Sequence, residues 1–194
     1  MSQLNIGVLG LQGDVAEHLA SLSRCGVAGC RVRRAGELAE VDGLIIPGGE
    51  SSTIGMLLDR FGLMVPLRKR IRGGMPVYGT CAGLILLATE IEGSRQTRIG
   101  CMDVAVLRNA YGRQVDSFEA PLQFRDEDQP PMRGIFIRAP RITRLLDPKV
   151  QVLMEAHGDP VLVRQGTMLA GSFHPELTDD ARVHRYFVEM VRHG

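Results

Sequence analysis

The sequence predicts an α/β fold in which helices cover both faces of a mostly parallel sheet. In the first half of the chain, short apolar segments with the character of strands alternate with segments of helical spacing. Several of these strands are apolar throughout, as is typical of strands buried on both faces. The second half has short strands separated by turns, which predicts an antiparallel extension of the sheet.

The elements of the first half follow one another with short connections. A buried strand over 4–12 leads into a helix from about Asp14 to Arg24, in which Val15, Leu19 and Leu22 recur at helical spacing. The elements expected after it are strands over 30–34 and 41–49, one or two helices over 52–72, a strand over 75–80 and a helix over 82–91.

The second half is predicted to be mainly β-structure with one closing helix. The helix spans about 180–191 and should pack Val183, Phe187 and Val191 on one face. Short strands are expected over 103–109, 134–140, 150–156, 160–166 and 168–174. No internal repeat or linker interrupts the chain, so we expect residues 1–194 to form a single domain.

Composition excludes several classes of function. The 194 residues are 44% hydrophobic and 23% charged, as in soluble globular proteins, and the net charge of +1 provides no field to attract nucleic acid or an anionic membrane. The basic run over 68–72 is interpreted as the solvated end of a helix. The uncharged stretch over 73–89 is rich in glycine and contains a proline, which favours a strand, a turn and a helix start over a membrane span.

The N-terminus and the cysteines point to a reducing compartment. The first residues lack the cationic opening of a secretory signal, so a cytoplasmic protein is expected. The four cysteines form no Cys-x-x-Cys pair and have no nearby histidine at zinc-ligand spacing, so no metal site is expected. The default for each cysteine is that of a small buried side chain.

Cys81 has surroundings that challenge this default. Residues 79–83, GTCAG, have the G-x-nucleophile-x-G spacing of a nucleophile elbow, with cysteine in place of serine. The small neighbours would let strand and helix approach closely, and the helix N-terminus would favour the thiolate. The alternative is an ordinary helix start with a buried cysteine, and the pentapeptide alone leaves both open.

A thiolate nucleophile needs a base that also protonates the leaving group, and the segment GSFHPEL supplies candidates. His174 and Glu176 are two residues apart, so in extended backbone their side chains would point the same way. Glu176 could then fix the tautomer of His174, as the acid of a catalytic triad does. The remaining histidines are interpreted as structural: His18, His157, His184 and His193.

Two glycine-rich turns follow apolar strands. Gly48 and Gly49, in IIPGGESS, would leave backbone N–H groups free to bind an oxyanion. A plain turn with Ser51 or Ser52 as the N-cap of the next helix is the alternative, and the two are compatible. The first turn, GVLGLQG, has the spacing G-x-x-G-x-x-G, which disfavours a dinucleotide-binding fingerprint.

With Cys81, His174 and Glu176 identified, the sequence resembles the class I (triad) glutamine amidotransferases. Within them it is similar to the family of glutaminase subunits of two-component pyridoxal 5′-phosphate synthases. The resemblance covers nearly the whole chain, and its most specific stretches are RNAYGRQVDSFEAPL and GIFIRAP, together with GVLGLQGDVAEH, VDGLIIPGGESST, GTCAGLILLA and GSFHPELTDD. It implies a three-layer, flavodoxin-like fold with a mostly parallel central sheet and an antiparallel extension.

The resemblance also implies roles for individual residues. Cys81 would be the nucleophile, His174 the general acid and base, and Glu176 its orienting partner. Further roles are carried over by position: the substrate-binding residues Gly49, Glu50, Ser51, Arg108, Ile137 and Arg138, the oxyanion-binding N–H groups of Gly48, Gly49 and Ala82, and the partner-facing residues Gln12 and His18. Arginine is chemically suited to the glutamine carboxylate, which its fork can bind through two hydrogen bonds.

The activity that the resemblance implies is hydrolysis of L-glutamine to L-glutamate and ammonia through a glutamyl thioester, without metal or organic cofactor. The ammonia would pass to a synthase subunit that makes pyridoxal 5′-phosphate. Two other readings stay open: a stand-alone thiol hydrolase of γ-glutamyl substrates on the same scaffold, and a catalytically silent binding subunit. The three intact triad positions argue against the silent subunit.

Overall fold

A twisted seven-stranded sheet forms the centre of the molecule. The structure is a computed structural model that describes residues 4–110, 117–125 and 128–194. Neighbouring strands follow the order β10-β11-β12-β4-β3-β1-β2. The strands of this sheet are β1 Ile6–Leu9, β2 Gly29–Val32, β3 Gly43–Ile46, β4 Val77–Thr80, β10 Gln151–Ala156, β11 Asp159–Gln165 and β12 Met168–Gly171.

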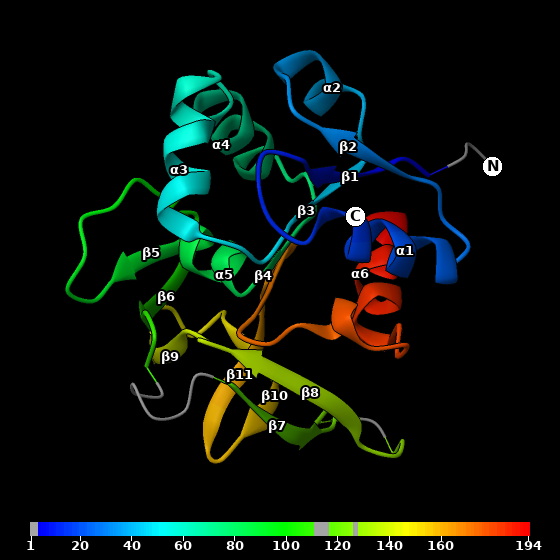
Figure 1. The fold of residues 1–194 in the computed structure, drawn as a ribbon, viewed down its shortest axis with the longest axis vertical. Coiled ribbons are helices and arrows are strands. Elements are labelled where there is room, and N and C mark those ends of the chain that lie inside the picture. Colours follow the sequence, from blue (N-terminus) through cyan, green and yellow to red (C-terminus); the bar gives the residue numbers. More distant parts are fainter. Residues whose placement is uncertain (1–3, 111–116, 126–127) are drawn as a thin grey trace.

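Helices cover both faces of this sheet, which confirms the predicted α/β class (Figure 1). One face packs against α1 Val15–Arg24 and α6 Arg182–His193, and the other against α2 Ala35–Ala39, α3 Ser51–Arg60, α4 Met64–Arg72 and α5 Ala82–Leu87. Within β1, Ile6 and Val8 point to the α1 and α6 side, whereas Leu9 points to the opposite side. The predicted stripe of α6, Val183, Phe187 and Val191, is buried as expected.

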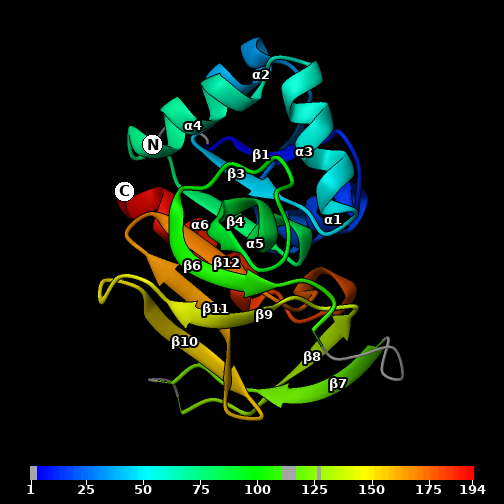
Figure 2. The same ribbon diagram turned by 90° about the vertical axis from the view of Figure 1, so that its left-hand side faces the viewer.

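Two smaller sheets extend the layers at the end of the molecule that carries β10 and β11 (Figure 2). One comprises β5 Ala88–Ile91, β6 Met102–Leu107 and β9 Arg141–Leu145 and adds to the α3–α5 side. The other is a hairpin of β7 Ser117–Leu122 and β8 Met132–Ile137, which packs on the α1 and α6 side. The short turn η1 Pro175–Leu177 precedes α6.

The order of the parallel strands determines where a ligand can bind. Strands β2, β1, β3, β4 and β12 are mutually parallel, and the chain reverses its direction of travel across the sheet between β1 and β3. In sheets of this kind, ligands bind beyond the carboxyl ends of the strands at such a reversal. The segments that leave β1, β3, β4 and β12 therefore meet at one edge.

The prediction of one helix over 82–91 was wrong. Helix α5 ends at Leu87, and Ala88 adopts an extended conformation with φ −58° and ψ 138°. Residues 88–91 form β5, which pairs in parallel with β6. The β-branched residues Thr89 and Ile91 favour a strand once β6 supplies hydrogen-bonding partners, and this pairing is not visible from local periodicity.

Other differences also come from long-range pairing. Strand β12 lies between β4, to which it is parallel, and β11, to which it is antiparallel, so only β10 and β11 form the antiparallel extension of the central sheet.

The stretch over 52–72 contains two helices, separated by a turn in which Gly62 has φ +67°. Helix α2 and strands β7 and β9 were not predicted. None of the helices in the described ranges combines the length and apolar composition needed to cross a bilayer.

Candidate active site

Cys81 occupies the sharp turn between β4 and α5. Its backbone has φ +48° and ψ −98°, a strained conformation for a residue with a side chain. A Cβ atom on Gly83 would lie 2.3 Å from the carbonyl oxygen of Ile46, and one on Gly79 would lie 2.6 Å from the backbone of Gly83. Glycine is therefore required on both sides of the turn, which supports the elbow reading.

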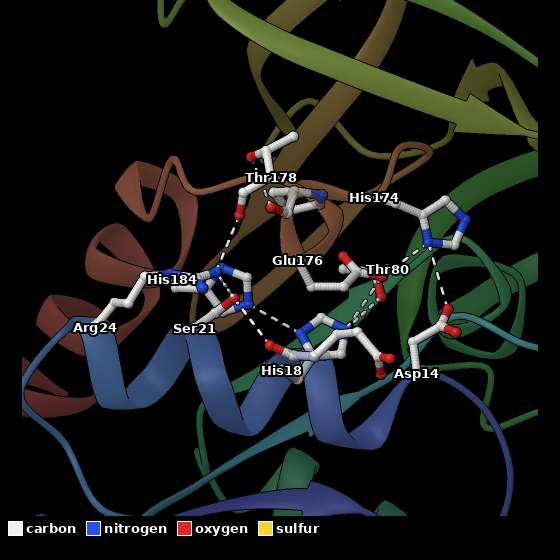
Figure 3. A network of polar contacts seen from close by, with 11 residues as sticks. Asp14, His18, Ser21, Arg24, Thr80, His174, Glu176, Thr178 and His184 are labelled. Carbon is white, nitrogen blue, oxygen red and sulfur yellow. Dashed lines mark hydrogen bonds and ion pairs between the residues drawn. The ribbon is translucent and has the colours of Figure 1, made fainter.

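His174 reaches Cys81 because β12 is the parallel neighbour of β4. Gly171 pairs with Thr80 at the ends of these strands, and the Cys81 N–H donates to the Gly171 carbonyl at 2.8 Å. The chain then turns and places the imidazole of His174 in the lining of the same cavity as Cys81. Figure 3 shows this imidazole between Asp14 and Glu176.

Glu176 is placed by a turn and not by extended backbone, which corrects the predicted geometry. Pro175–Leu177 form a short 3-10 helix, and the carboxylate accepts a hydrogen bond from Nδ1 of His174 to its Oε1 at 2.8 Å. Both residues are 4% exposed. The pairing leaves Nε2 of His174 as the nitrogen available to the thiol.

The electrostatics favour a protonated His174. Burial acts against its charged form, but the interactions with Cys81 and with the hydrogen-bonded Glu176 outweigh this and raise the pKa of His174 to about 10. Burial raises the pKa of Glu176 above its ordinary value, and His174 opposes that shift. We therefore assign an imidazolium at His174 that faces a carboxylate at Glu176. Among the described residues, His174 is the only one able to carry a positive charge within hydrogen-bond distance of Glu176.

Asp14 was not predicted as a site residue. Its Oδ2 lies 3.6 Å from Nδ1 of His174, and burial raises the pKa of this half-buried carboxyl. One ligand atom each from Asp14, His174 and Glu176 lie within 4.8 Å of one another, a spacing that a metal ion could use. Hydrogen bonding already accounts for the arrangement, since Nδ1 of His174 is bonded to Glu176.

A cavity of about 300 Å³ opens above Cys81. It brings together all six residues expected to bind substrate with the nucleophile and its base: Gly49, Glu50, Ser51, Arg108, Ile137, Arg138, Cys81 and His174. Gln12, Asp14, Ile85, Asn109 and Leu177 complete its lining. Larger hollows lie elsewhere on the described part of the chain, but neither Cys81 nor His174 lines them.

The turn after β3 is held against the loop after β1. The Asp14 N–H donates to the Gly48 carbonyl at 3.1 Å, and the Glu50 N–H donates to Oε1 of Gln12 at 2.8 Å. Gly49 has φ +152°, and a Cβ atom on Gly48 would lie 2.5 Å from the His174 ring. The helix α3 is capped by Glu50 without a side-chain bond, so the N-cap predicted at Ser51 or Ser52 is wrong.

Arg108 is held in place by two partners. Its guanidinium donates to Oε1 of Gln96 at 2.6 Å and to Oε1 of Glu50 at 3.0 Å. Gln96 in turn donates to the hydroxyl of Ser51 at 3.1 Å. Gln96 was missed by the sequence reasoning, because it lies in a loop with no motif around it. The following part of the RNAYGRQVDSFEAPL segment, residues 111–116, lies outside the described residues.

His18 lies beneath the cavity and not at the surface. Its Nδ1 is 2.9 Å from Nε2 of His184, and its Nε2 is 3.0 Å from Oγ1 of Thr80 and 3.6 Å from Oε1 of Glu176 (Figure 3). Its side chain is fully buried, so the expected contact between His18 and a partner is not available in this conformation. The structural reading of His18 and His184 is supported, whereas Gln12 does reach the cavity.

The buried histidines predict a stability that depends on pH. Burial, together with the nearby Arg24, lowers the pKa of His184 to about 3, whereas in the unfolded chain it is close to 6.5. Between these values the unfolded chain binds one proton more, so the stabilisation is complete above pH 6.5 and is lost as the pH falls. We expect His184 to cost wild type about 2 kcal/mol of unfolding free energy between pH 8 and pH 5.

Urea unfolding of wild type and His184→Gln at pH 8, 6 and 5 measures this difference. The variant lacks the titrating imidazole, so its unfolding free energy should fall less steeply with pH. Parallel curves for the two proteins would contradict the expectation.

Comparisons with known proteins agree with this geometry. The model of the SNO glutamine amidotransferase family matches residues 8–193. The chain is 56% identical to "Pyridoxal 5′-phosphate synthase subunit PdxT" of Carboxydothermus hydrogenoformans, over 98% of this chain and 100% of the relative. It is also 56% identical to the protein of the same name from a Parafrankia species, over 99% of this chain and 95% of the relative.

Solved structures of other proteins have a similar fold. A crystal structure described as a glutamine amidotransferase superposes with a TM-score of 0.91 at 49% identity, covering 96% of this chain and 98% of the other. The structure of PurLQS from Thermotoga maritima has a TM-score of 0.70 at 15% identity, covering 100% of this chain and 97% of the other. At that identity the second similarity concerns the fold alone.

Proposed function

The chain belongs to the SNO glutamine amidotransferase family, and from this premise we propose that it is the glutaminase subunit of a pyridoxal 5′-phosphate synthase. It hydrolyses L-glutamine to L-glutamate and ammonia and delivers the ammonia to the synthase subunit. The observation that carries the proposal is that Cys81 and His174 line the same 300 Å³ cavity, with Glu176 hydrogen bonded to His174. The names of the full-length relatives support the choice of synthase.

The first half-reaction forms a thioester. The thiolate of Cys81 attacks the side-chain amide carbon of glutamine, and the carbonyl oxygen takes up the negative charge. The oxyanion is stabilised by backbone N–H groups of Gly48, Gly49 and Ala82. The imidazolium of His174 gives its proton to the departing nitrogen, so the C–N bond breaks and ammonia leaves.

The second half-reaction releases glutamate. His174, now neutral, takes a proton from water, and the resulting hydroxide attacks the thioester carbon. The C–S bond breaks, glutamate departs, and the thiolate and imidazolium are restored. Glu176 keeps Nδ1 of His174 protonated throughout, so Nε2 is the atom that exchanges the proton.

Ammonia delivery explains why the enzyme works within a complex. Ammonia that reaches bulk water is protonated at neutral pH and ceases to be a nucleophile. A docked synthase subunit that covers the cavity mouth would receive it unprotonated. Gln12 lines this cavity and is the residue that we propose to contact the partner. We propose that the chain acts as one domain in the cytoplasm, without metal or organic cofactor.

The test is glutamate release from glutamine by the protein alone and with the synthase subunit. We expect release to rise steeply when the partner is added. Equal turnover of γ-glutamyl peptides without the partner would favour a stand-alone thiol hydrolase, and no glutamate from the complex would favour a silent binding subunit.

Arg108→Ala is expected to raise the KM for glutamine by about 10- to 100-fold, since a hydrogen bond to a charged group contributes about 1.5–3 kcal/mol. The Arg108 guanidinium lines the cavity and is fixed by Gln96 and Glu50. Arg108→Lys should recover only part of the loss, because an ammonium lacks the planar fork.

Steady-state kinetics of the complex measures this KM. Arg144→Ala is the matched control, since Arg144 pairs with Glu90 on the small sheet and does not line the cavity. An unchanged KM in Arg108→Ala would remove Arg108 from the substrate-binding residues.

A further inference from the structure

Three buried side chains beneath Glu176 take no part in the steps above. His18 comes from α1, His184 from α6 and Thr80 from the end of β4, and each is 0% exposed. Their polar atoms form a continuous chain that ends 3.6 Å from the Glu176 carboxylate. Buried polar groups are costly unless each is paired, so the direction of these hydrogen bonds has consequences.

The direction of these hydrogen bonds is set at His184, the end of the series farthest from Glu176. Nδ1 of His184 is buried without a hydrogen-bond partner among the described residues, and the positive charge of Arg24 acts on this ring. The nearby positive charge of Arg24 favours a bare lone pair at this nitrogen over a proton. A proton there would be an unpaired buried donor close to a like charge, which is unfavourable.

The rest of the chain follows from that choice. With Nδ1 of His184 bare, its Nε2 carries the proton and donates to Nδ1 of His18 at 2.9 Å. Nδ1 of His18 is then the acceptor, and the proton of His18 is on Nε2. That N–H donates to Oγ1 of Thr80 at 3.0 Å and directs its positive end toward Oε1 of Glu176 at 3.6 Å.

Both histidines stay neutral over the working pH range. Burial, together with His184 and His174, lowers the pKa of His18 well below 6.5, and burial lowers that of His184. The titratable groups around His18 come from three elements: His184 from α6, Tyr78 from β4, and His174 and Glu176 from the segment after β12. A neutral, directed chain is therefore the resting arrangement.

We propose that His18 is a positioning residue of the triad. The hydrogen bond from His184 orients its Nε2–H, which donates to Thr80, the residue before the nucleophile. The same N–H also points its positive end toward the Glu176 carboxylate, which orients His174. This role adds a supporting residue to the glutaminase reaction, and it rests on the function proposed above. It connects α1, α6, β4 and η1 to both reacting side chains through one imidazole.

The tautomers are tested directly by imidazole ¹⁵N NMR on the full chain. We expect Nε2 protonated and Nδ1 bare in both His18 and His184, with His184→Gln used to assign the signals. A proton on Nδ1 of His18, or an imidazolium at pH 7, would overturn the proposal. This readout does not depend on glutamine turnover.

Substitutions at position 18 separate the two hydrogen bonds. His18→Gln places an amide nitrogen near the position of Nε2 and should keep kcat of the complex within about threefold. His18→Asn places one near Nδ1, loses the donor to Thr80, and should lower kcat by about 10- to 100-fold with little change in KM, as for other groups that support a reacting residue. Equal losses in the two variants would contradict the proposal.

Stability alone must be separated from positioning. Leu22→Ala is the matched control, because Leu22 is buried on the same helix, faces the hydrophobic core and has no hydrogen-bonding side chain. Its kcat should stay near wild type at a temperature where all variants are folded, although its Tm falls. A loss of kcat in Leu22→Ala equal to that in His18→Asn would reduce the role of His18 to packing.

A third readout distinguishes failure of this inference from failure of the glutaminase assignment. Alkylation of Cys81 by iodoacetamide, followed by peptide mass spectrometry as a function of pH, reports the thiolate held by His174 without any glutamine. The pH profile should shift in His18→Asn and not in His18→Gln. An unshifted profile in His18→Asn refutes the positioning role, whereas absence of glutamate release from wild type refutes only the reaction.

Discussion

Cys81→Ala is expected to abolish glutamate release by the complex, with a fall in kcat of about 10⁴-fold or more, as for removal of other catalytic nucleophiles. Cys81 occupies a strained turn and lines the same cavity as His174, whose pKa is raised to about 10. Without the sulfur no thioester can form, and the remaining groups can only orient the substrate. Alanine suits the crowded turn, so the variant should fold.

The measurement is single-turnover glutamate release by wild type and variant with the synthase subunit present. Trapping of the thioester in acid should succeed only with wild type. Cys101→Ala is the control, since Cys101 is half-buried against the core and does not line the cavity. Full activity in Cys81→Ala would show that this thiol only packs.

Glu176→Gln is expected to lower kcat by about 10²- to 10⁴-fold while KM changes little, by analogy with the loss of the orienting acid in other triads. The amide is nearly isosteric but carries no charge, so it cannot stabilise the imidazolium in a site that is 4% exposed. The hydrogen bond at 2.8 Å also loses its charged acceptor.

The pH dependence of kcat should also change in Glu176→Gln, in a direction that follows from the pKa of His174. Glu176 contributes to the raised pKa of His174, which is about 10 in wild type. Loss of the carboxylate should lower that pKa, so the imidazolium that protonates the leaving nitrogen disappears at a lower pH. The alkaline limb of kcat should therefore move toward neutrality. Glu119→Gln, at an exposed carboxylate paired with Arg133, should leave the limb in place; equal limbs in wild type and Glu176→Gln would refute the role.

Sequence alone was sufficient for the parts of the site that depend on local geometry. The small residues around Cys81 predicted a strand–turn–helix crossing, and a Cβ on Gly79 or Gly83 would indeed meet backbone. The apolar strands predicted a mostly parallel sheet, because a strand buried on both faces cannot alternate polar and apolar residues. Both properties depend on residues that are neighbours in the chain.

The sequence analysis predicted the wrong local structure, or missed a residue, where the outcome depends on how distant segments pack and on how the chain turns after a strand. Residues 88–91 have a helix-compatible pattern, yet they form β5 because β6 and β9 provide a sheet for them. Glu176 was expected in extended backbone, but the turn after β12 places it. Gln96 had no motif at all, and its role comes from its contacts with Arg108 and Ser51 across the fold.

The sequence by itself determined the chemistry: a thiol in a tight glycine turn, a histidine and a carboxylate, and an α/β scaffold to carry them. These follow from side-chain reactivity and local backbone sterics, which are properties of short segments. Only the tertiary structure decided that β12 lies beside β4, that His174 meets Cys81, and that His18 lies buried beneath Glu176 and not at a partner surface. The physical reason is that hydrogen bonding and burial between distant segments depend on strand order and packing, which no local pattern encodes.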